Sequence, residues 1–350
     1  MATKLMDNAK KNKADEFYTQ LADIETELKH YKEHFKDKVI FCNCDDPFES
    51  NFFKYFAMNF NAFGLKKLIC TSYDNSPVAY TQLSLFNENE KQVPISNRKA
   101  YKIEITEVDD YNNDGAVDLS DVYYLLKNKK NGLHLLQGNG DFRSDECIEL
   151  LKESDIVITN PPFSLFREYI AQLTEYSKDY IIMGNTNALT YKEVFKLFKE
   201  DKIRTGYTNF NVGMYFYVPD DCEKYHKIVD GKKMVRVSTS CWFTSLPVKK
   251  HTENLVLYKL YTPEEYPKYD NYDAINIKTY LDIPEDYDGY MGVPITFLDK
   301  FNPKQFDIIG MAASAGYKKE IVGLDFLGSK DARPLINGKN TYARVFIKRK

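Results

Sequence analysis

Residues 158–170 read ITNPPFSLFREYI, and this stretch decides the fold. The apolar run that leads into it, residues 155–159 (DIVIT), is typical of a buried strand, and residues 165–176 have the spacing of an amphipathic helix. Two prolines at the junction fix φ, and each one keeps the residue before it out of the helical region. The sequence therefore predicts a strand, a rigid extended loop and a helix, which is the repeating unit of an α/β sheet.

The chain around this unit repeats the same alternation. Strands are predicted over residues 38–43, 67–71, 101–106, 133–137 and 180–183, and helices over residues 51–61, 146–151 and 191–200. This spacing predicts parallel strands with helices on both faces of the sheet. Two later apolar runs, residues 212–218 and 241–245, have no helix between them, so we expect them to form an antiparallel pair.

Composition and charge set only broad limits. The chain of 350 residues has 48 Lys and Arg against 51 Asp and Glu, so its net charge of −3 neither demands nor excludes a polyanionic partner. No apolar stretch is long enough to span a membrane, and residues 1–13 are polar and lysine-rich. We therefore expect a cytoplasmic protein, with reduced thiols at its six cysteines. We also expect it to be a monomer.

The Asn-Pro-Pro-Phe loop offers two hydrogen-bond acceptors beside an aromatic face. Asn160 and Pro161 are held extended, so the Asn160 side-chain oxygen and the Pro161 carbonyl are rigidly presented, and Phe163 adds a flat ring. This set suits the exocyclic NH₂ of a nucleobase, because two fixed acceptors localise the nitrogen lone pair and stabilise the charge of attack. Such a base is flipped or single-stranded. The alternative is a turn that only ends the strand.

This loop resembles the [D/N/S]-P-P-[Y/F] motif of the amino-methyltransferases. Nearly the whole chain is similar to the EcoRI-type adenine-specific DNA methyltransferases, through residues 13–20 (KADEFYTQ), 39–56, 138–146, 213–221, 241–246, 292–310 and 336–350. The resemblance implies an α/β fold, with a Rossmann-like S-adenosylmethionine-dependent methyltransferase sheet and a C-terminal target-recognition region. Tyr-, Pro- and Gly-rich sequence from about Leu255 on places the boundary between a cofactor-binding and catalytic domain, residues 1–254, and a DNA target-recognition region, residues 255–350.

The resemblance also implies a reaction and a set of site residues. The reaction is transfer of a methyl group from S-adenosylmethionine to N6 of a flipped adenine in double-stranded DNA, in a restriction-modification or epigenetic context. The residues that hold the adenine are Asn160, Pro161, Pro162 and Phe163. The cofactor residues are Tyr18 and Thr19 at the methionine end, Asn43, Asp45 and Asp46 after the first strand, Asp74 at the ribose, and Asp141 and Phe142 near the adenosine.

Two of these assignments have local alternatives. The loop after the first strand has no glycine, unlike that of most methyltransferases, so close approach of its backbone to a ligand is less easy. Asp45 and Asp46 also fit a helix N-cap, with Pro47 as the first helical residue. Asp74 also fits an Asp-Asn-Ser-Pro turn.

Residues 110–121 (DYNNDGAVDLSD) have the spacing of an EF-hand loop. The ligand positions would be occupied by Asp110, Asn112, Asp114, Asp118 and Asp121, with a helix predicted over residues 122–129. Against calcium, no second loop of this kind is present and the last position is Asp rather than Glu. The alternative is an Asp/Asn/Gly turn with a helix cap at Ser120.

Basic residues concentrate near the C-terminus. Residues 301–350 contain ten Lys and Arg and four Asp and Glu, a charge of +6 that leaves −9 for the rest. This asymmetry favours phosphate binding there. The candidate DNA contacts are Arg333, Lys339 and Arg344, with Lys318, Lys319, Lys330 and Arg349 as further members. Each cation taken alone also fits a solvated surface charge.

No catalytic role is predicted for the histidines. We interpret four histidines as surface or helix residues, which agrees with a reaction that needs no histidine base: His30, His34, His226 and His251.

One rival function is methyl transfer to adenine in RNA, which would use the same catalytic residues. The other is a catalytically inactive, methyltransferase-like DNA-binding protein, against which the intact Asn160–Phe163 motif argues.

Overall fold

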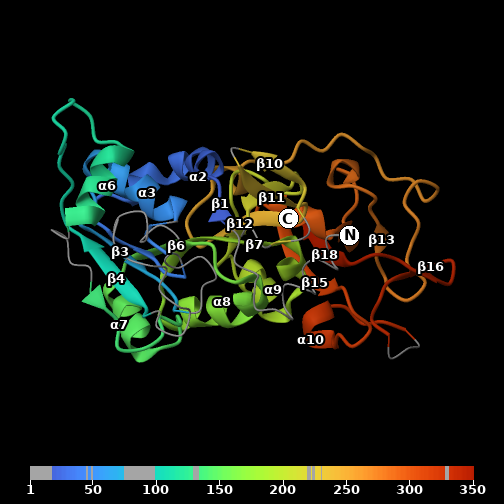
Figure 1. Ribbon diagram of the computed structural model, residues 1–350. Helices are drawn as coiled ribbons and strands as arrows, with labels where there is room; N and C mark the ends of the chain where they lie inside the picture. Colours follow the sequence, from blue (N-terminus) through green and yellow to red (C-terminus); the bar gives the residue numbers. More distant parts are fainter. Residues whose placement is uncertain are drawn as a thin grey trace. The chain divides into compact units, whose positions relative to one another are not determined.

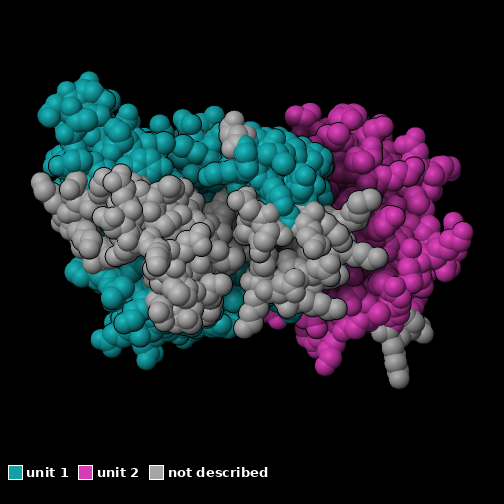
Figure 2. All heavy atoms as spheres, viewed as in Figure 1, with its two compact units in different colours: residues 1–185, 206–243 teal, residues 186–205, 244–350 magenta. Residues whose placement is uncertain are grey.

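The computed structural model describes residues 18–44, 46–48, 50–74, 99–128, 134–218, 222, 225–229, 231–327 and 331–350. The chain forms two compact units, which Figure 2 colours separately. The first unit contains residues 1–185 and 206–243, and the second contains residues 186–205 and 244–350. These units reflect packing, and the assignment of residues 255–350 to target recognition stays a prediction.

A large mixed sheet forms the centre of the first unit. Its strand order is β5-β4-β3-β2-β6-β7-β12. The parallel strands are β2 (Val39–Cys42), β3 (Lys67–Thr71), β6 (Ile156–Thr159) and β7 (Asp179–Asn185). The residues of β2 and β6 are buried throughout, as expected for strands covered on both faces. The prediction of an α/β fold is confirmed at this level.

One predicted strand runs opposite to the direction expected. Strand β4 (Tyr101–Ile105) pairs antiparallel with β3, so the prediction of parallel strands throughout is wrong. Hydrogen bonds extend this pairing past the end of β3, where the Ser72 amide donates to the Tyr101 carbonyl at 2.9 Å and the Tyr101 amide donates to Ser72 Oγ at 3.0 Å. Strand β5 (His134–Leu135) pairs antiparallel with β4 in turn.

Helices cover both faces of this sheet, as Figure 1 shows. On one side lie α2 (Leu21–Leu28), α3 (Asn51–Met58) and α6 (Leu119–Asn128), and on the other lie α7 (Asp145–Glu153) and α8 (Phe166–Glu175). Shorter helical segments are η1 (Lys29–His34), α4 (Phe60–Phe63) and η3 (Phe163–Leu165). The predicted helices over residues 51–61, 146–151 and 165–176 are confirmed.

A second sheet of the first unit corrects another prediction. Its order is β1-β9-β11-β10, with β1 (Tyr18–Thr19), β9 (Met214–Tyr217), β10 (Lys227–Val229) and β11 (Lys232–Val237). Strand β12 (Ser240–Thr244) instead lies beside β7 in the large sheet. Residues 212–218 and 241–245 are therefore not an antiparallel pair, because β9 takes β1 and β11 as its partners.

The second unit is built around a smaller sheet. Its order is β13-β14-β18-β15, with β13 (Ile275–Asn276), β14 (Met291–Pro294), β15 (Phe306–Ala312) and β18 (Arg344–Arg349). A hairpin is formed by β16 (Leu335–Ile336) and β17 (Lys339–Asn340). The other elements are η4 (Thr186–Thr190), α9 (Lys192–Lys199), β8 (Arg204–Thr205), η5 (Lys249–His251), η6 (Tyr280–Asp282), η7 (Ile295–Lys300) and α10 (Lys319–Val322). Within the described part of the chain, no helix has the length and apolar character needed to cross a bilayer.

Candidate active site

The Asn-Pro-Pro-Phe loop lies at the carboxyl end of β6. Asn160 follows the last strand residue, Pro161 is buried, and Phe163 begins the short helix η3 that leads into α8. Because β2, β3 and β6 are parallel, their carboxyl ends meet at one edge of the sheet, which is where ligands bind in open α/β sheets. We call this the catalytic edge.

Asn43, directly after β2, is joined to the strand and helix on both sides of the Asn-Pro-Pro-Phe loop. The Thr159 hydroxyl donates to the Asn43 carbonyl, and the Tyr169 hydroxyl of α8 donates to Asn43 Oδ1. Asn43 is 2% exposed and Tyr169 is fully buried. The two buried hydrogen bonds fix the loop after β2 relative to the loop after β6, so the predicted cofactor and catalytic segments are neighbours.

Asp46 supports the loop after β2 from within. Its Oδ1 accepts from the Phe48 amide at 2.9 Å and from the Tyr101 hydroxyl at 2.8 Å. The helix-cap alternative for Asp46 is wrong, since α3 begins at Asn51 and Ser50 Oγ accepts from the Phe53 amide at 3.1 Å. Asp45 lies outside the described residues.

The ends of β3 and β5 contact each other at the same edge. The Asp74 amide donates to the Asn139 carbonyl at 2.9 Å. Gly140 has φ +78°, and a Cβ added there would lie 2.0 Å from the Ser72 carbonyl oxygen. A glycine is required at Gly140 for both reasons. The segments that contain Asp74 and Asp141 are therefore held side by side.

Asp141 and Phe142 are both engaged in contacts within the protein. Asp141 accepts from the Arg143 amide and guanidinium at 2.7–2.9 Å, and these bonds hold the pKa of the Asp141 carboxyl below its ordinary value. Arg143 Nη1 also donates to Glu168 Oε2 of α8 at 2.8 Å. The Phe142 ring is 4% exposed and meets the Tyr169 ring edge-on, with centroids 5.0 Å apart. Stacking of Phe142 on an adenosine stays a prediction.

The short strand β1 contacts the first turn of α3. The Thr19 carbonyl accepts from Asn51 Nδ2 at 2.8 Å, and Thr19 is buried. Tyr18 pairs through its backbone with Tyr217 of β9. The predicted N-terminal cofactor motif is thus placed beside the segment that follows β2, and the part of that motif before Tyr18 lies outside the described residues.

The loop at residues 110–121 is held by hydrogen bonds among its own groups. Asp110 accepts from the amides of Asp114 and Gly115 at 3.2 and 2.8 Å. Asp118 and Asp121 form a reciprocal helix cap, since Asp118 Oδ1 accepts from the Ser120 amide at 2.7 Å and Asp121 Oδ2 accepts from the Asp118 amide at 2.9 Å. The cap is therefore Asp118 rather than Ser120.

Calcium binding by this loop, through Asp110, Asn112, Asp114 and Asp121, stays a hypothesis. Among the described residues, no three His, Cys, Asp or Glu side chains are arranged to hold a metal ion. The internal hydrogen bonds account for the turn without one.

The predicted DNA contacts lie in the second unit. Arg333 Nη2 is 2.6 Å from Asp331 Oδ2, so its guanidinium is paired with a carboxylate. Lys339 is exposed on the hairpin strand β17, and Arg344 Nε donates to Asn276 Oδ1 at 3.1 Å. The assignment of these three residues to DNA binding stays a prediction.

Two results concern residues whose role the sequence did not predict. Tyr169 lies within residues 165–176, which the sequence predicted only as a helix, and no sequence signal marked its hydroxyl as a contact of Asn43. From the sequence, His251 is interpreted as a surface or helix residue; it lies in the helical segment η5 and is 3% exposed, with Nδ1 2.8 Å from the Phe301 carbonyl oxygen. It is therefore a helix residue but not a surface one, because residues far away in sequence cover it.

Comparison with known proteins identifies the class of enzyme. A family model described as "Adenine-specific methyltransferase EcoRI" matches residues 5–350. The Type II methyltransferase M.EcoRI of Escherichia coli is 44% identical, with 99% of this chain and 97% of that protein covered. The Type II methyltransferase M.MpnI of Mycoplasma pneumoniae is 36% identical, with 98% and 97% covered. No solved structure matches the chain.

These matches define an adenine-specific DNA methyltransferase. Within that class, the chain belongs to the EcoRI family.

Proposed function

We propose that the chain transfers the methyl group of S-adenosylmethionine to N6 of a flipped adenine in double-stranded DNA, on a Rossmann-like methyltransferase sheet. One observation carries this proposal. The Asn160–Phe163 loop lies at the carboxyl end of β6, and Thr159 and Tyr169 join it to the loop after β2. A target amine at Asn160 and a donor held by the β2 loop would then be neighbours.

Asn160 and Pro161 would accept from the two N–H bonds of the adenine amine. Their oxygens favour the transition state over the ground state, because positive charge develops on that nitrogen only during attack. Phe163 is half-buried at the start of η3 and would stack on the extruded base. The nitrogen loses its proton after transfer, so no dedicated base is required.

The residues of the catalytic edge fit S-adenosylmethionine in chemical type. Bound there, it would supply an electrophilic methyl group. Asp46, Asp74 and Asp141 follow β2, β3 and β5, so carboxylates suited to an ammonium and to ribose hydroxyls follow three strands of one sheet. Asn43 would hold its position through Tyr169 while the cofactor binds. Tyr18, Thr19, Asp45 and Phe142 remain proposed cofactor contacts.

Residues 255–350 are proposed to recognise the target, with Arg333, Lys339 and Arg344 as contacts. We also expect a monomer in the cytoplasm. The concentration of basic residues in residues 301–350 supports the recognition role.

The test measures labelled methyl transfer to duplex DNA and to RNA, with the wild type and with Asn160→Ala. We expect label in duplex DNA, and a loss of about 10²–10³ in kcat for Asn160→Ala with retained cofactor binding. Label in RNA with none in DNA would favour the RNA enzyme. Label in neither would favour the inactive DNA-binding protein.

A further inference from the structure

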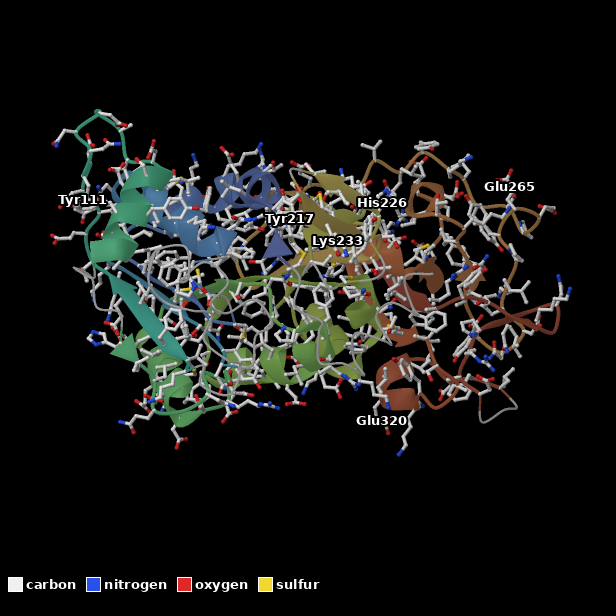
Figure 3. All side chains as sticks on the ribbon, in the orientation of Figure 1. Tyr111, Tyr217, His226, Lys233, Glu265 and Glu320 are labelled. Carbon is white, nitrogen blue, oxygen red and sulfur yellow. The ribbon has the colours of Figure 1, made fainter. Side chains whose placement is uncertain are left out.

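The four-stranded sheet β1-β9-β11-β10 has a face that the proposed reaction does not use. Strand pairing places Tyr215 opposite Arg236, and places both Tyr217 and Lys227 opposite Met234. Opposite residues and every second residue along a strand share a face. The resulting face, which we call the basic-aromatic face, consists of Tyr215, Tyr217, Lys227, Val229, Lys232, Met234 and Arg236. Figure 3 labels Tyr217 on β9, and His226 just before β10.

Cations and aromatic rings alternate on this face. Lys227 Nζ lies 4.1 Å from the centroid of the Tyr215 ring, and Lys232 Nζ lies 5.6 Å from that of Tyr217. Lys227, Lys232 and Arg236 are exposed, whereas Met214 and Phe216 on the other face of β9 are buried. The tyrosine rings therefore support charged groups that stand at the surface.

The cations of this face differ from three of the cations near the C-terminus. Among the residues that the structure describes, Lys227, Lys232 and Arg236 are in no salt bridge. In contrast, Lys319, Arg333 and Arg349 lie 2.5, 2.6 and 3.0 Å from Asp325, Asp331 and Asp288. A phosphate must compete with a carboxylate for each of those three. On the basic-aromatic face it competes with water and counterions, and at Arg236 also with the Val212 carbonyl, which accepts from Arg236 Nη2 at 2.7 Å.

The basic-aromatic face leads directly to the catalytic edge. Strand β11 turns through Ser238 and Thr239 into β12, which lies beside β7. Asn185 Nδ2, at the carboxyl end of β7, donates to Thr239 Oγ1 at 2.6 Å. Since β7 is parallel to β6, the Arg236 end of the face adjoins the edge where Asn160 lies.

We propose that the basic-aromatic face binds the phosphate backbone of DNA beside the target adenine. This inference rests on the proposed function and adds a contact surface in the first unit to the predicted recognition region. Rings interleaved with cations are typical of nucleic-acid-binding surfaces, where they meet sugars and bases as well as phosphates. An acidic protein partner would use the charges but not the rings.

The test measures equilibrium binding to a random-sequence DNA duplex of about 30 base pairs between about 50 and 200 mM salt. The variant is Lys227→Gln/Lys232→Gln, at exposed positions. Loss of two phosphate contacts should make the slope of log K against log salt shallower by about 1.8 and weaken binding roughly 10- to 100-fold. Lys227→Arg/Lys232→Arg keeps the charges and should keep the slope.

The matched control is Lys29→Gln/Lys152→Gln, the same charge change at two exposed lysines of the same unit. Lys152 Nζ also lies 5.9 Å from the Tyr176 ring centroid, but unlike Lys227 and Lys232 it is in a salt bridge, 2.7 Å from Glu149 Oε1, so Lys29 is the closer match of the two. The control should leave the slope unchanged, and titration with S-adenosylmethionine should give equal affinities for all variants.

Failure of this inference is distinguishable from failure of the proposed function. A wild type that methylates DNA, together with a Lys227→Gln/Lys232→Gln variant of unchanged slope and affinity, would overturn the phosphate contact alone. An equal loss in the Lys29→Gln/Lys152→Gln control would overturn it too, because net charge rather than the face would then govern binding. Absence of methyl transfer by the wild type would count against the proposed function instead.

Discussion

At the scale of single residues, the buried side chain of Tyr169 contacts several segments of the proposed site. Its ring packs against Phe142 near one predicted cofactor loop, and its oxygen donates to Asn43 in another. The same residue lies on the helix that follows Asn160–Phe163. One buried side chain thus contacts three segments of the proposed site.

Tyr169→Phe should therefore weaken cofactor binding more than it weakens the fold. The substitution keeps the ring but leaves the buried Asn43 Oδ1 without this donor, at a cost of about 1–3 kcal/mol. We expect affinity for S-adenosylmethionine to fall about tenfold, measured by calorimetric titration. Tyr176→Phe, the same change at the C-terminal end of α8, is the control. Equal affinities for both variants would refute the positioning role of Tyr169.

At the scale of elements, a buried carboxylate joins α2 to the segment before β9. Glu27 is fully buried, and its two oxygens accept from the amides of Tyr207 and Thr208 at 2.7 Å each. The Thr208 and Tyr31 hydroxyls donate to it as well, at 2.6 and 2.9 Å. Four donors surround two acceptors, so the site requires a group that has no N–H of its own.

Glu27→Gln should accordingly destabilise the first unit. The glutamine NH₂ would face at least one donor, and a lost buried hydrogen bond with an unsatisfied donor costs about 2 kcal/mol or more. We expect a lower urea midpoint, followed by circular dichroism, while Glu25→Gln at an exposed position of α2 leaves it unchanged. A wild-type midpoint for Glu27→Gln would show that the four contacts contribute little.

At the scale of the whole molecule, burial of one histidine links stability to pH. His251 is enclosed in the second unit by Thr205 and Phe301, and Thr205 Oγ1 donates to Asp299 at 2.9 Å. Burial lowers the pKa of His251 from its ordinary value of 6.5, with the contact to Lys250 acting in the same direction. The folded protein therefore takes up this proton less readily than the unfolded chain.

Unfolding should become easier as the pH falls below about 6.5. In that range the unfolded chain binds a proton that folded His251 does not, so the free energy of unfolding decreases by up to about 1.4 kcal/mol per pH unit. The free energy of unfolding, measured by urea denaturation from pH 8 to pH 5, should decrease in this way in the wild type and in His134→Asn, whose histidine is exposed. The decrease should be smaller in His251→Asn. Parallel curves for all three proteins would contradict the assignment.

The local pattern of the sequence by itself determined the strand, the extended loop and the helix around Asn160, and the order of the polar strand ends. These features depend on neighbouring residues, since proline restricts its own φ and the residue before it, and burial on both faces makes a strand continuously apolar. The motifs along the chain also indicated the family, which the comparisons confirmed.

Only the tertiary structure decided which segments pair and which groups are covered. The reversal of β4, the pairing of β9 with β1 and β11, and the burial of His251 all depend on partners distant in sequence. A short apolar run fits either strand direction equally well, so its direction is set by the neighbour it meets. The contacts of Tyr169 with Asn43 and of Lys227 with Tyr215 arise in the same way, from chain segments that folding brings together.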